Sequence, residues 1–198
     1  MQKRLIVFIL LFASFGLVYS SIAYYLQSRL PSEEFISWGV FSHTGNLSGY
    51  FSGPGANVTV GEILSWHFAI TNNMGSIQFV RMVYRLANST YLSPNSTVPA
   101  DGVPEIGNSS IFVAKSQTGV LNFTWGIVSK TVSSGLVFLR MMINGRQVSS
   151  QVGADAGQRF RFFFELWTYD TQSQTFLYGY KGQTSRVGEP LQIWFNVE

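Results

Sequence analysis

The stretch Ile63-Leu-Ser-Trp-His-Phe-Ala-Ile-Thr71 decides the fold class of this chain. Large apolar side chains recur there at every second position, which is the period of a β-strand and not of a helix. One face of the expected strand carries four of them: Leu64, Trp66, Phe68 and Ile70. The other face carries Ser65 and His67, as expected where one side of a sheet packs on a core. The stretch therefore predicts a half-buried strand.

The same alternation recurs further along the chain. It predicts half-buried strands at Val80–Leu86, Leu121–Ile127 and Phe160–Leu166. The first of these follows Asn72-Asn73-Met74-Gly75, and Asn and Gly tolerate the positive φ angles of tight turns. We therefore expect the strands on either side of this turn to form a hairpin.

One segment, Leu136–Ile143, breaks the alternation because it is apolar on both faces apart from Arg140. We expect it to be covered on both sides or to meet a partner. It ends at Asn144-Gly145, the strongest short hairpin signal, so Arg146–Val152 should fold back beside it.

No long segment after Phe35 has apolar residues at helical spacing. Residues 87–110 are rich in Ser, Asn, Pro and Gly and predict one long surface loop. About eight to ten short strands without crossover helices are typical of an antiparallel sandwich. The prediction for residues 31–198 is thus a mostly β, immunoglobulin-like β-sandwich domain.

The N-terminus has a different character. Lys3 and Arg4 precede an uncharged apolar run from Leu5 to Leu26, long enough for a helix of roughly 30 Å, the hydrocarbon thickness of a bilayer. Residues 1–30 are therefore expected to form a single membrane anchor helix with a short connector. The alternative is a cleaved signal peptide, supported by the small residues Ser21 and Ala23.

The flanking charges predict the orientation of this anchor. Lys3 and Arg4 form the stronger cationic flank, which stays cytoplasmic by the positive-inside rule. The expected topology is single-pass in the cell membrane, with residues 5–26 in lipid and the C-terminal domain extracytoplasmic.

Composition excludes several classes of function. The formal charge of +3 includes Lys3, Arg4 and Arg29, so the rest of the chain is neutral and has no basic run. The electrostatic footprint of a nucleic-acid binder is therefore missing. The chain has no cysteine, so disulfides and thiolate chemistry are excluded, and stability must come from its apolar core.

Six of the ten asparagines lie in the acceptor sequence Asn-x-Ser/Thr, which marks N-glycosylation in exported proteins. They are Asn46, Asn57, Asn88, Asn95, Asn108 and Asn122. The alternative is that these residues only form turns, above all at the clustered Asn88, Asn95 and Asn108. Because the last 70-odd residues lack such a site, we expect the C-terminal strands to present a glycan-free face to a neighbour.

Catalytic and metal-binding patterns are scarce. His43 and His67 are the only histidines, and neither belongs to a ligand pair of the HExxH type. His67 should face solvent from its strand. Asp101, Asp155 and Asp170 stand alone in expected loops, where acids are ordinarily solvated or cap turns. The sequence therefore predicts no enzyme, no cofactor and no metal site.

Five tryptophans could form a sugar-binding platform, but core packing is the better explanation for Trp66 and Trp125, which share apolar strand faces. Trp167 is the exception. It shares its expected face with Arg161 and Tyr169, so these three residues are the candidate interface, with Trp167 as an exposed aromatic anchor.

Two parts of the chain resemble a known family. The first contains Phe35-Ile-Ser-Trp38, Val58-Thr-Val-Gly-Glu62 and Ala69-Ile-Thr-Asn-Asn73. The second contains Phe164-Glu-Leu-Trp167 and Pro190-Leu-Gln-Ile-Trp-Phe-Asn-Val197. In this order they are similar to the archaeal domain-of-unknown-function family 1616. The resemblance implies a membrane-attached, extracytoplasmic β domain. It implies no catalytic residues.

These observations together predict a membrane-anchored, N-glycosylated cell-surface protein that acts as a structural or accessory subunit and binds a protein partner. Two alternatives remain open. One is a pilin-like filament subunit, processed after Lys3-Arg4, with its N-terminal helix in the fibre core. The other is an extracellular module that binds sugars or peptides through exposed aromatic residues such as Trp167, which a concave aromatic pocket would favour.

Overall fold

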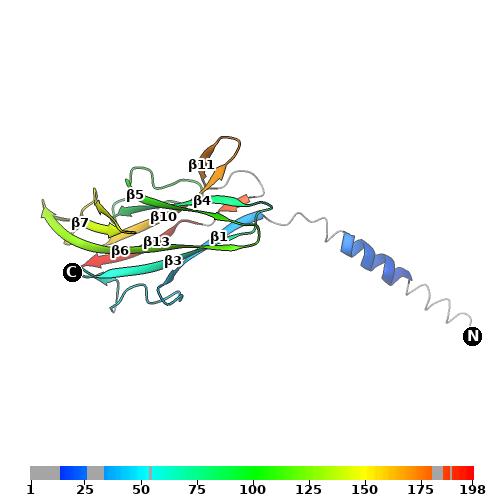
Figure 1. Cartoon of the computed structure of the whole chain (residues 1–198), viewed down its shortest axis with the longest axis horizontal. Helices are drawn as coiled ribbons and strands as arrows, with labels where there is room; N and C mark the ends of the chain where they lie inside the picture. Colours follow the sequence, from blue (N-terminus) through cyan, green and yellow to red (C-terminus); the bar gives the residue numbers. More distant parts are fainter. Residues whose placement is uncertain (1–13, 26–33, 54, 180–184, 188) are drawn as a thin grey trace, which may run out of the picture. The chain divides into compact units, whose positions relative to one another are not determined.

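The computed structural model describes residues 14–25, 34–53, 55–179, 185–187 and 189–198. The chain divides into two compact units, Met1–Glu33 and Glu34–Glu198. In the first unit, residues 14–25 are helical (Figure 1). None of the helical segments among the described residues has the length and apolar character to cross a membrane. Lys3, Arg4 and both ends of the predicted 5–26 span lie outside the described residues.

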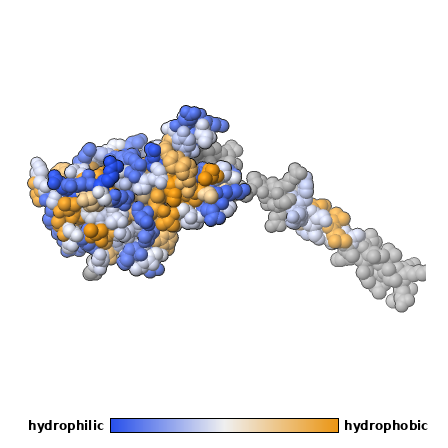
Figure 2. Space-filling model, viewed as in Figure 1, coloured by the Kyte–Doolittle hydropathy of each residue, from blue (hydrophilic) through white to orange (hydrophobic). Residues whose placement is uncertain are grey.

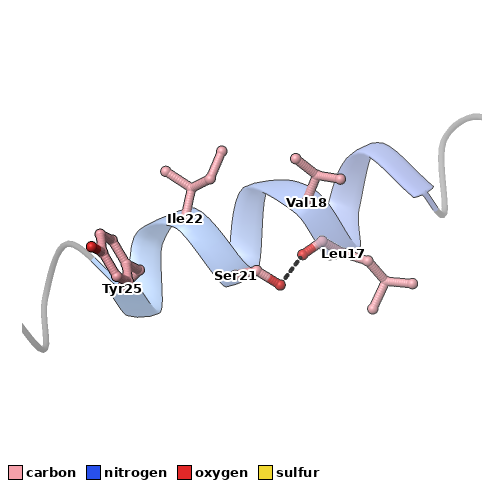
Figure 3. Close-up of a pocket in the computed structure, with 5 residues that line it drawn as sticks. All are labelled: Leu17, Val18, Ser21, Ile22 and Tyr25. Atoms are coloured by element: carbon pink, nitrogen blue, oxygen red, sulfur yellow. Dashed lines mark hydrogen bonds between the residues drawn. The ribbon is translucent and has the colours of Figure 1, made fainter.

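Two serine hydroxyls of the described helix bond within it. The hydroxyl of Ser21 donates to the backbone carbonyl of Leu17 at 2.7 Å. The hydroxyl of Ser20 donates to the backbone carbonyl of Gly16. Figure 3 shows Val18 and Ile22 on the same side of this helix, on neighbouring turns. Both serine hydroxyls are thus satisfied within the helix.

The second unit consists of β-strands in two sheets that pack face to face (Figure 1). Sheet 1 runs in the order β12 (Ser185–Val187), β1 (Glu34–Ser42), β3 (Ile63–Asn72), β6 (Thr118–Ser133), β7 (Leu136–Ile143) and β8 (Arg146–Ser149), with β9 (Ala154–Asp155) beside β7. Sheet 2 runs in the order β2 (Asn57–Val58), β13 (Leu191–Val197), β10 (Phe160–Asp170), β4 (Gln78–Ala87) and β5 (Glu105–Val113), with β11 (Thr175–Tyr178) beside β10.

Strand pairing is mixed. The pairs β1–β12 and β13–β2 are parallel, and the other pairs of described strands are antiparallel. The mostly β prediction is confirmed, whereas a purely antiparallel sandwich is not.

The core between the sheets is aromatic. Trp66 and Trp125 are buried with their rings 5.2 Å apart, and Phe162 lies 4.9 Å from Trp125 and 6.0 Å from Trp66. Burying each such side chain stabilises the fold by roughly 2–3 kcal/mol. The prediction that these two tryptophans belong to the core is confirmed.

The predicted hairpin at residues 72–75 is wrong, because β3 lies in sheet 1 and β4 in sheet 2. Asn72 is fully buried at this crossing. Its amide donates to the carbonyls of Ser76 at 2.9 Å and Val113 at 2.8 Å, and its oxygen accepts from the amide of Met74 at 2.8 Å. The turn passes between the sheets because the apolar faces of β3 and β4 meet the same core from opposite sides.

The second predicted hairpin is confirmed. Asn144 and Gly145 have φ angles of 47° and 77°, and Ile143 pairs with Arg146. On β7, alternate residues from Val137 to Ile143 are buried. On the opposite face Leu136 and Met142 are exposed, so this strand is not covered on both sides.

The strand β10 differs from its prediction. Phe160, Phe162 and Phe164 face the core as expected, but Arg161 and Glu165 on the other face are buried as well. The cause is the segment 88–104, here called the strap, which covers this face. The predicted surface loop at 87–110 is therefore wrong in part: its end forms β5, and Ala100 and Val103 are buried.

Candidate functional site

The outer face of sheet 2, beneath the strap, holds the predicted interface residue Arg161. Only 4% of its surface is exposed. Its guanidinium donates to the carbonyls of Asn88 and Tyr91 and to the side chains of Ser93 and Gln192. It also lies 4.3 Å from the ring centroid of Phe163 and 4.6 Å from that of Trp194. Burial lowers the pKa of Arg161. This residue holds the strap and offers no free surface, so its assignment to an open interface is wrong.

Glu165 is the second anchor of the strap and is fully buried. Its carboxylate accepts a hydrogen bond from the backbone amide of Ala100 at 2.6 Å and forms an ion pair with Arg85 at 3.1 Å. Arg85 in turn donates to the carbonyl of Val103 at 2.5 Å. The side chains of Arg161, Glu165 and Arg85 thus form hydrogen bonds with backbone groups of the strap that would otherwise be buried without a partner.

Trp167 and Tyr169 lie on the same outer face, toward the β10–β11 hairpin. Trp167 is half-buried, its indole N–H donates to Glu165 at 3.3 Å, and its ring lies 5.3 Å from that of Tyr178. The Tyr178 hydroxyl donates to the carbonyl of Asn95 in the strap. Burial raises the pKa of Tyr178, and the charges of Glu165 and Glu189 add to the effect. Trp167 therefore belongs to the strap's support and is not the exposed anchor expected from the sequence.

Tyr169 belongs to an aromatic cluster that the sequence did not indicate. The ring of Phe79 stacks on that of Phe112 at 4.2 Å and lies 5.2 Å from that of Phe176, which in turn lies 5.3 Å from that of Tyr169. Phe112 is 65% exposed. The four residues come from β4, β5, β10 and β11. Only the pairing register, which aligns Phe79 with Phe112 and Tyr169 with Phe176, brings them together.

The cluster includes a cation. The guanidinium of Arg81 lies 3.8 Å from the centroid of the Phe176 ring, within the range of a cation–π contact. Its Nε atom is buried and has no hydrogen-bond partner among the described residues. In Figure 2, hydrophobic residues gather in a band on the visible face of the β unit, below the hairpin that contains β11.

The histidines and lone acids do not converge. Among the described residues, no group of three or more His, Asp or Glu side chains could hold a metal ion. His67 lies on the outer face of sheet 1, as predicted, with its Nδ1 atom 2.8 Å from Oδ1 of Asn122. Asp170 caps its own turn by accepting from the amide and hydroxyl of Ser173.

Three of the six sequon asparagines lie in strands and three in connecting segments: Asn57 is in β2, Asn108 in β5 and Asn122 in β6, whereas Asn46 is in the loop after β1 and Asn88 and Asn95 are in the strap. Five have exposed side chains: Asn46, Asn57, Asn95, Asn108 and Asn122. Asn88 is half-buried, and its amide nitrogen donates to the carbonyl of Gly153 at 2.8 Å. Of the four other asparagines, Asn144 alone is exposed. Five of the six sequon asparagines are thus exposed, against one of the four others. Asn88 and Asn95 also form turns, as the alternative expects, because their Oδ1 atoms accept from the backbone amides of Thr90 and Thr97 at 2.9 Å.

The strands β10 and β13 do not present the glycan-free face that was expected of the C-terminal strands. Strand β13 pairs with β2, which carries Asn57, and β10 lies beneath the strap, which contains Asn88 and Asn95. These strands lie in the middle of sheet 2, so they have no face separate from the sequons.

Two grooves on the β unit bear on ligand binding. One, of about 420 Å³, lies between the ends of β5 and β7–β8 and is lined by Tyr84, Glu105 and Arg146 among others. Another, of about 390 Å³, is lined by Ala56, Ser89, Arg159, Trp194, Phe195 and Asn196. In this second groove Trp194 is 42% exposed, whereas Phe195 is buried. Neither groove is the concave aromatic pocket that a sugar-binding or peptide-binding module predicts.

Comparison with known proteins gives a likeness of fold at low similarity. No protein-family model matches the chain, and no curated protein matches it. The crystal structure of a CARDB domain from Pyrococcus furiosus, in complex with di-metal ions, superimposes with a TM-score of 0.38 at 8% identity, covering 84% of this chain and 90% of that one. The solution structure of the same domain superimposes with a TM-score of 0.35 at 11% identity, covering 83% of this chain and 96% of that one.

A sporulation control protein from Bacillus subtilis gives a TM-score of 0.27 at 9% identity, covering 83% of this chain and 91% of that one. At these scores the likenesses carry no argument about function.

Proposed function

We propose that this chain is a membrane-anchored, N-glycosylated protein with a non-catalytic role, a structural or accessory subunit of an assembly outside the cytoplasm. In this proposal residues 5–26 lie in lipid, and Lys3 and Arg4 stay on the cytoplasmic side. The bonding of Ser20 and Ser21 within the helix supports it, because hydroxyls in hydrocarbon need an internal partner.

The observation that carries the proposal is the exposure of the sequon asparagines. A glycan is bulky and hydrophilic, so its attachment site must lie on the surface. Five of the six sequon side chains meet this condition, whereas Asn72, which lies in no sequon, is fully buried and structural.

The same proposal includes the finer assignments of fold and family. We assign the sandwich to the immunoglobulin-like class and the chain to the archaeal family 1616. The ordered stretches from Phe35 to Asn73 and from Phe164 to Val197 support the family, and the crossing from sheet 1 to sheet 2 after β3 supports the class.

The test is to isolate the full chain from its native cells and map its glycopeptides by mass spectrometry. We expect the chain in the membrane fraction, with glycans at several of the five exposed sequons and none at Asn144, an exposed asparagine outside any sequon. Cross-linking in native membranes before mild detergent extraction should recover a protein partner. A chain found free in the cytosol with unmodified asparagines would contradict the proposal.

A further inference from the structure

The outer face of sheet 1 differs in chemistry from that of sheet 2. On β1, β3 and β6 the outward positions carry no Asp, Glu, Lys or Arg. They are Phe35, Ser37, Gly39 and Phe41 on β1, Ile63, Ser65, His67, Ala69 and Thr71 on β3, and Thr118, Val120, Asn122, Thr124 and Gly126 on the part of β6 that pairs with β3. The strap covers the charged outer face of sheet 2, whereas no described segment makes comparable hydrogen bonds to these outward side chains.

Side-chain hydrogen bonds join β3 to β6 across this face. Ser65 bonds to Thr124 at 3.1 Å, His67 to Asn122 at 2.8 Å and Thr71 to Thr118 at 2.8 Å. Each pair is directly opposed in the strand register. Such cross-strand pairs stabilise a sheet and fix the rotamers of their members. The result is an ordered, uncharged array of hydroxyl, amide and imidazole groups.

Asn122 lies in the middle of this array and begins the sequon Asn122-Phe-Thr124. Its Oδ1 atom is held by His67, and its Nδ2 atom, to which a glycan would be attached, has no hydrogen-bond partner among the described residues. Four other sequon amides are engaged: that of Asn88 by Gly153, that of Asn57 by Glu198, that of Asn108 by Glu105 and that of Asn46 by Thr44. The Nδ2 atom of Asn95 resembles that of Asn122 in having no partner among the described residues, but Asn95 lies in the strap and not on this face.

We infer that the carbohydrate attached to Asn122 lies across the outer face of β1, β3 and β6 and covers it. This inference rests on the glycosylation in the proposed function. Sugar hydroxyls can form hydrogen bonds with the Ser, Thr and His side chains, each of which can still donate or accept a further bond. The apolar faces of sugar rings match Val120 and Ala69. Because the glycan is rooted on β6, at one side of this three-stranded face and opposite His67, midway along the pairing of β3 with β6, it also excludes a flat protein partner from the face.

The chemical reactivity of the His67 imidazole shows whether the glycan covers the face, because the ring bonds to Asn122. His43, in the exposed loop after β1, is an internal reference. The probe is diethyl pyrocarbonate, which acylates accessible imidazoles, applied to the full chain in its native membranes and read by mass spectrometry. Thr124→Val removes the sequon but keeps Asn122 and the shape of residue 124. Thr124→Ser keeps both the sequon and the hydroxyl and is the matched control.

We expect His67 to react several-fold faster in Thr124→Val than in the wild type, with His43 unchanged and Thr124→Ser behaving as the wild type. Thr124→Val also loses its bond to Ser65, so enzymatic removal of glycans from the wild type is the second measurement and should produce the same increase.

Three results would overturn the inference. The first is an unmodified Asn122 beside glycans at Asn95 or Asn46, which leaves the proposed function standing. The second is a glycan on Asn122 with no change at His67 after its removal, which means that the sugar points away from the sheet. The third is continued protection of His67 in a dimeric Thr124→Val chain, which assigns the face to a second copy. Bare asparagines throughout would instead refute the proposed function itself.

Discussion

Arg85 and Glu165 form an ion pair at 3.1 Å on the outer face of sheet 2, and the Glu165 side chain is fully shielded from solvent. The pair joins neighbouring strands, β4 and β10, and both residues also bond to backbone groups of the strap. A buried carboxylate is tolerated only where a cation and hydrogen bonds replace its lost water. The strap and the pair therefore depend on each other.

Replacement of Arg85 by Met tests this dependence. The Glu165 carboxylate would remain buried without its cation, and the free energy of unfolding should fall by about 3–5 kcal/mol. Urea denaturation of the full chain measures the change. Arg140→Met is the control, because Arg140 is exposed on β7, and it should lie within about 0.5 kcal/mol of the wild type. Equal losses in the two variants would show that the pair has no special role.

The two central tryptophans give a second prediction. The indole N–H of Trp66 donates to the carbonyl of Tyr50 at 2.8 Å, whereas that of Trp125 is buried without a partner among the described residues. Trp→Phe removes the same atoms at both positions, but only Trp66→Phe also leaves a carbonyl unpaired. Trp66→Phe should therefore cost about 1 kcal/mol more than Trp125→Phe in thermal or urea unfolding. The reverse order would contradict the assigned hydrogen bonds.

Asn72 and Asn73 form a matched pair at the crossing between the sheets. Asn72→Ala leaves the carbonyls of Ser76 and Val113 without their side-chain donor and should destabilise the fold by at least about 2 kcal/mol. Asn73→Ala removes a half-buried side chain that makes no hydrogen bond to the described residues, and should change stability by about 0.5 kcal/mol or less. If both variants unfold at the same urea concentration, the buried amide does not hold the crossing.

Tyr178 predicts a dependence on alkaline pH. Because its pKa is raised in the folded state, the folded chain keeps this proton at a pH where the unfolded chain has lost it. Its contribution to stability is thus complete below the ordinary tyrosine pKa of about 10 and falls as the pH rises above it. Tyr178→Phe should be less stable than the wild type at pH 8 by about 1 kcal/mol, for the lost bond to Asn95.

That difference in the free energy of unfolding should shrink at pH 10 and again at pH 11, as only the wild type loses the contribution of the phenol. Urea denaturation at the three pH values measures it. A gap that stays constant from pH 8 to pH 11 would show that Tyr178 titrates alike in both states.

Local pattern was enough to predict strands within β3, β4, β6, β7 and β10 and the two-residue hairpin between β7 and β8. It did not indicate the second two-residue hairpin, at Ser134-Gly135 between β6 and β7. The period of two in Ile63–Thr71 locates the core face of β3, and Asn144-Gly145 takes the positive φ angles that its turn requires. Core positions for Trp66 and Trp125 follow from the same period. All of these depend on residues that lie within a few positions of one another.

The candidate interface could not be predicted in the same way. Arg161, Glu165 and Trp167 occupy outward positions of β10, and the pattern correctly separates them from the core face. Their burial depends on the strap, which is about 70 residues earlier in the sequence and carries no periodic signal. For the same reason the cluster of Phe79, Phe112, Tyr169 and Phe176 became visible only with the strand register.

The sequence by itself determined that this chain is a cysteine-free β protein with an apolar N-terminal run and six potential glycan sites. Tertiary structure decided which strands share a sheet, which outer face the strap covers and which asparagines remain exposed. The physical reason is that side-chain alternation specifies only which face of a strand avoids water, whereas the partner that covers it comes from distant segments, and their contacts are set by packing the whole core.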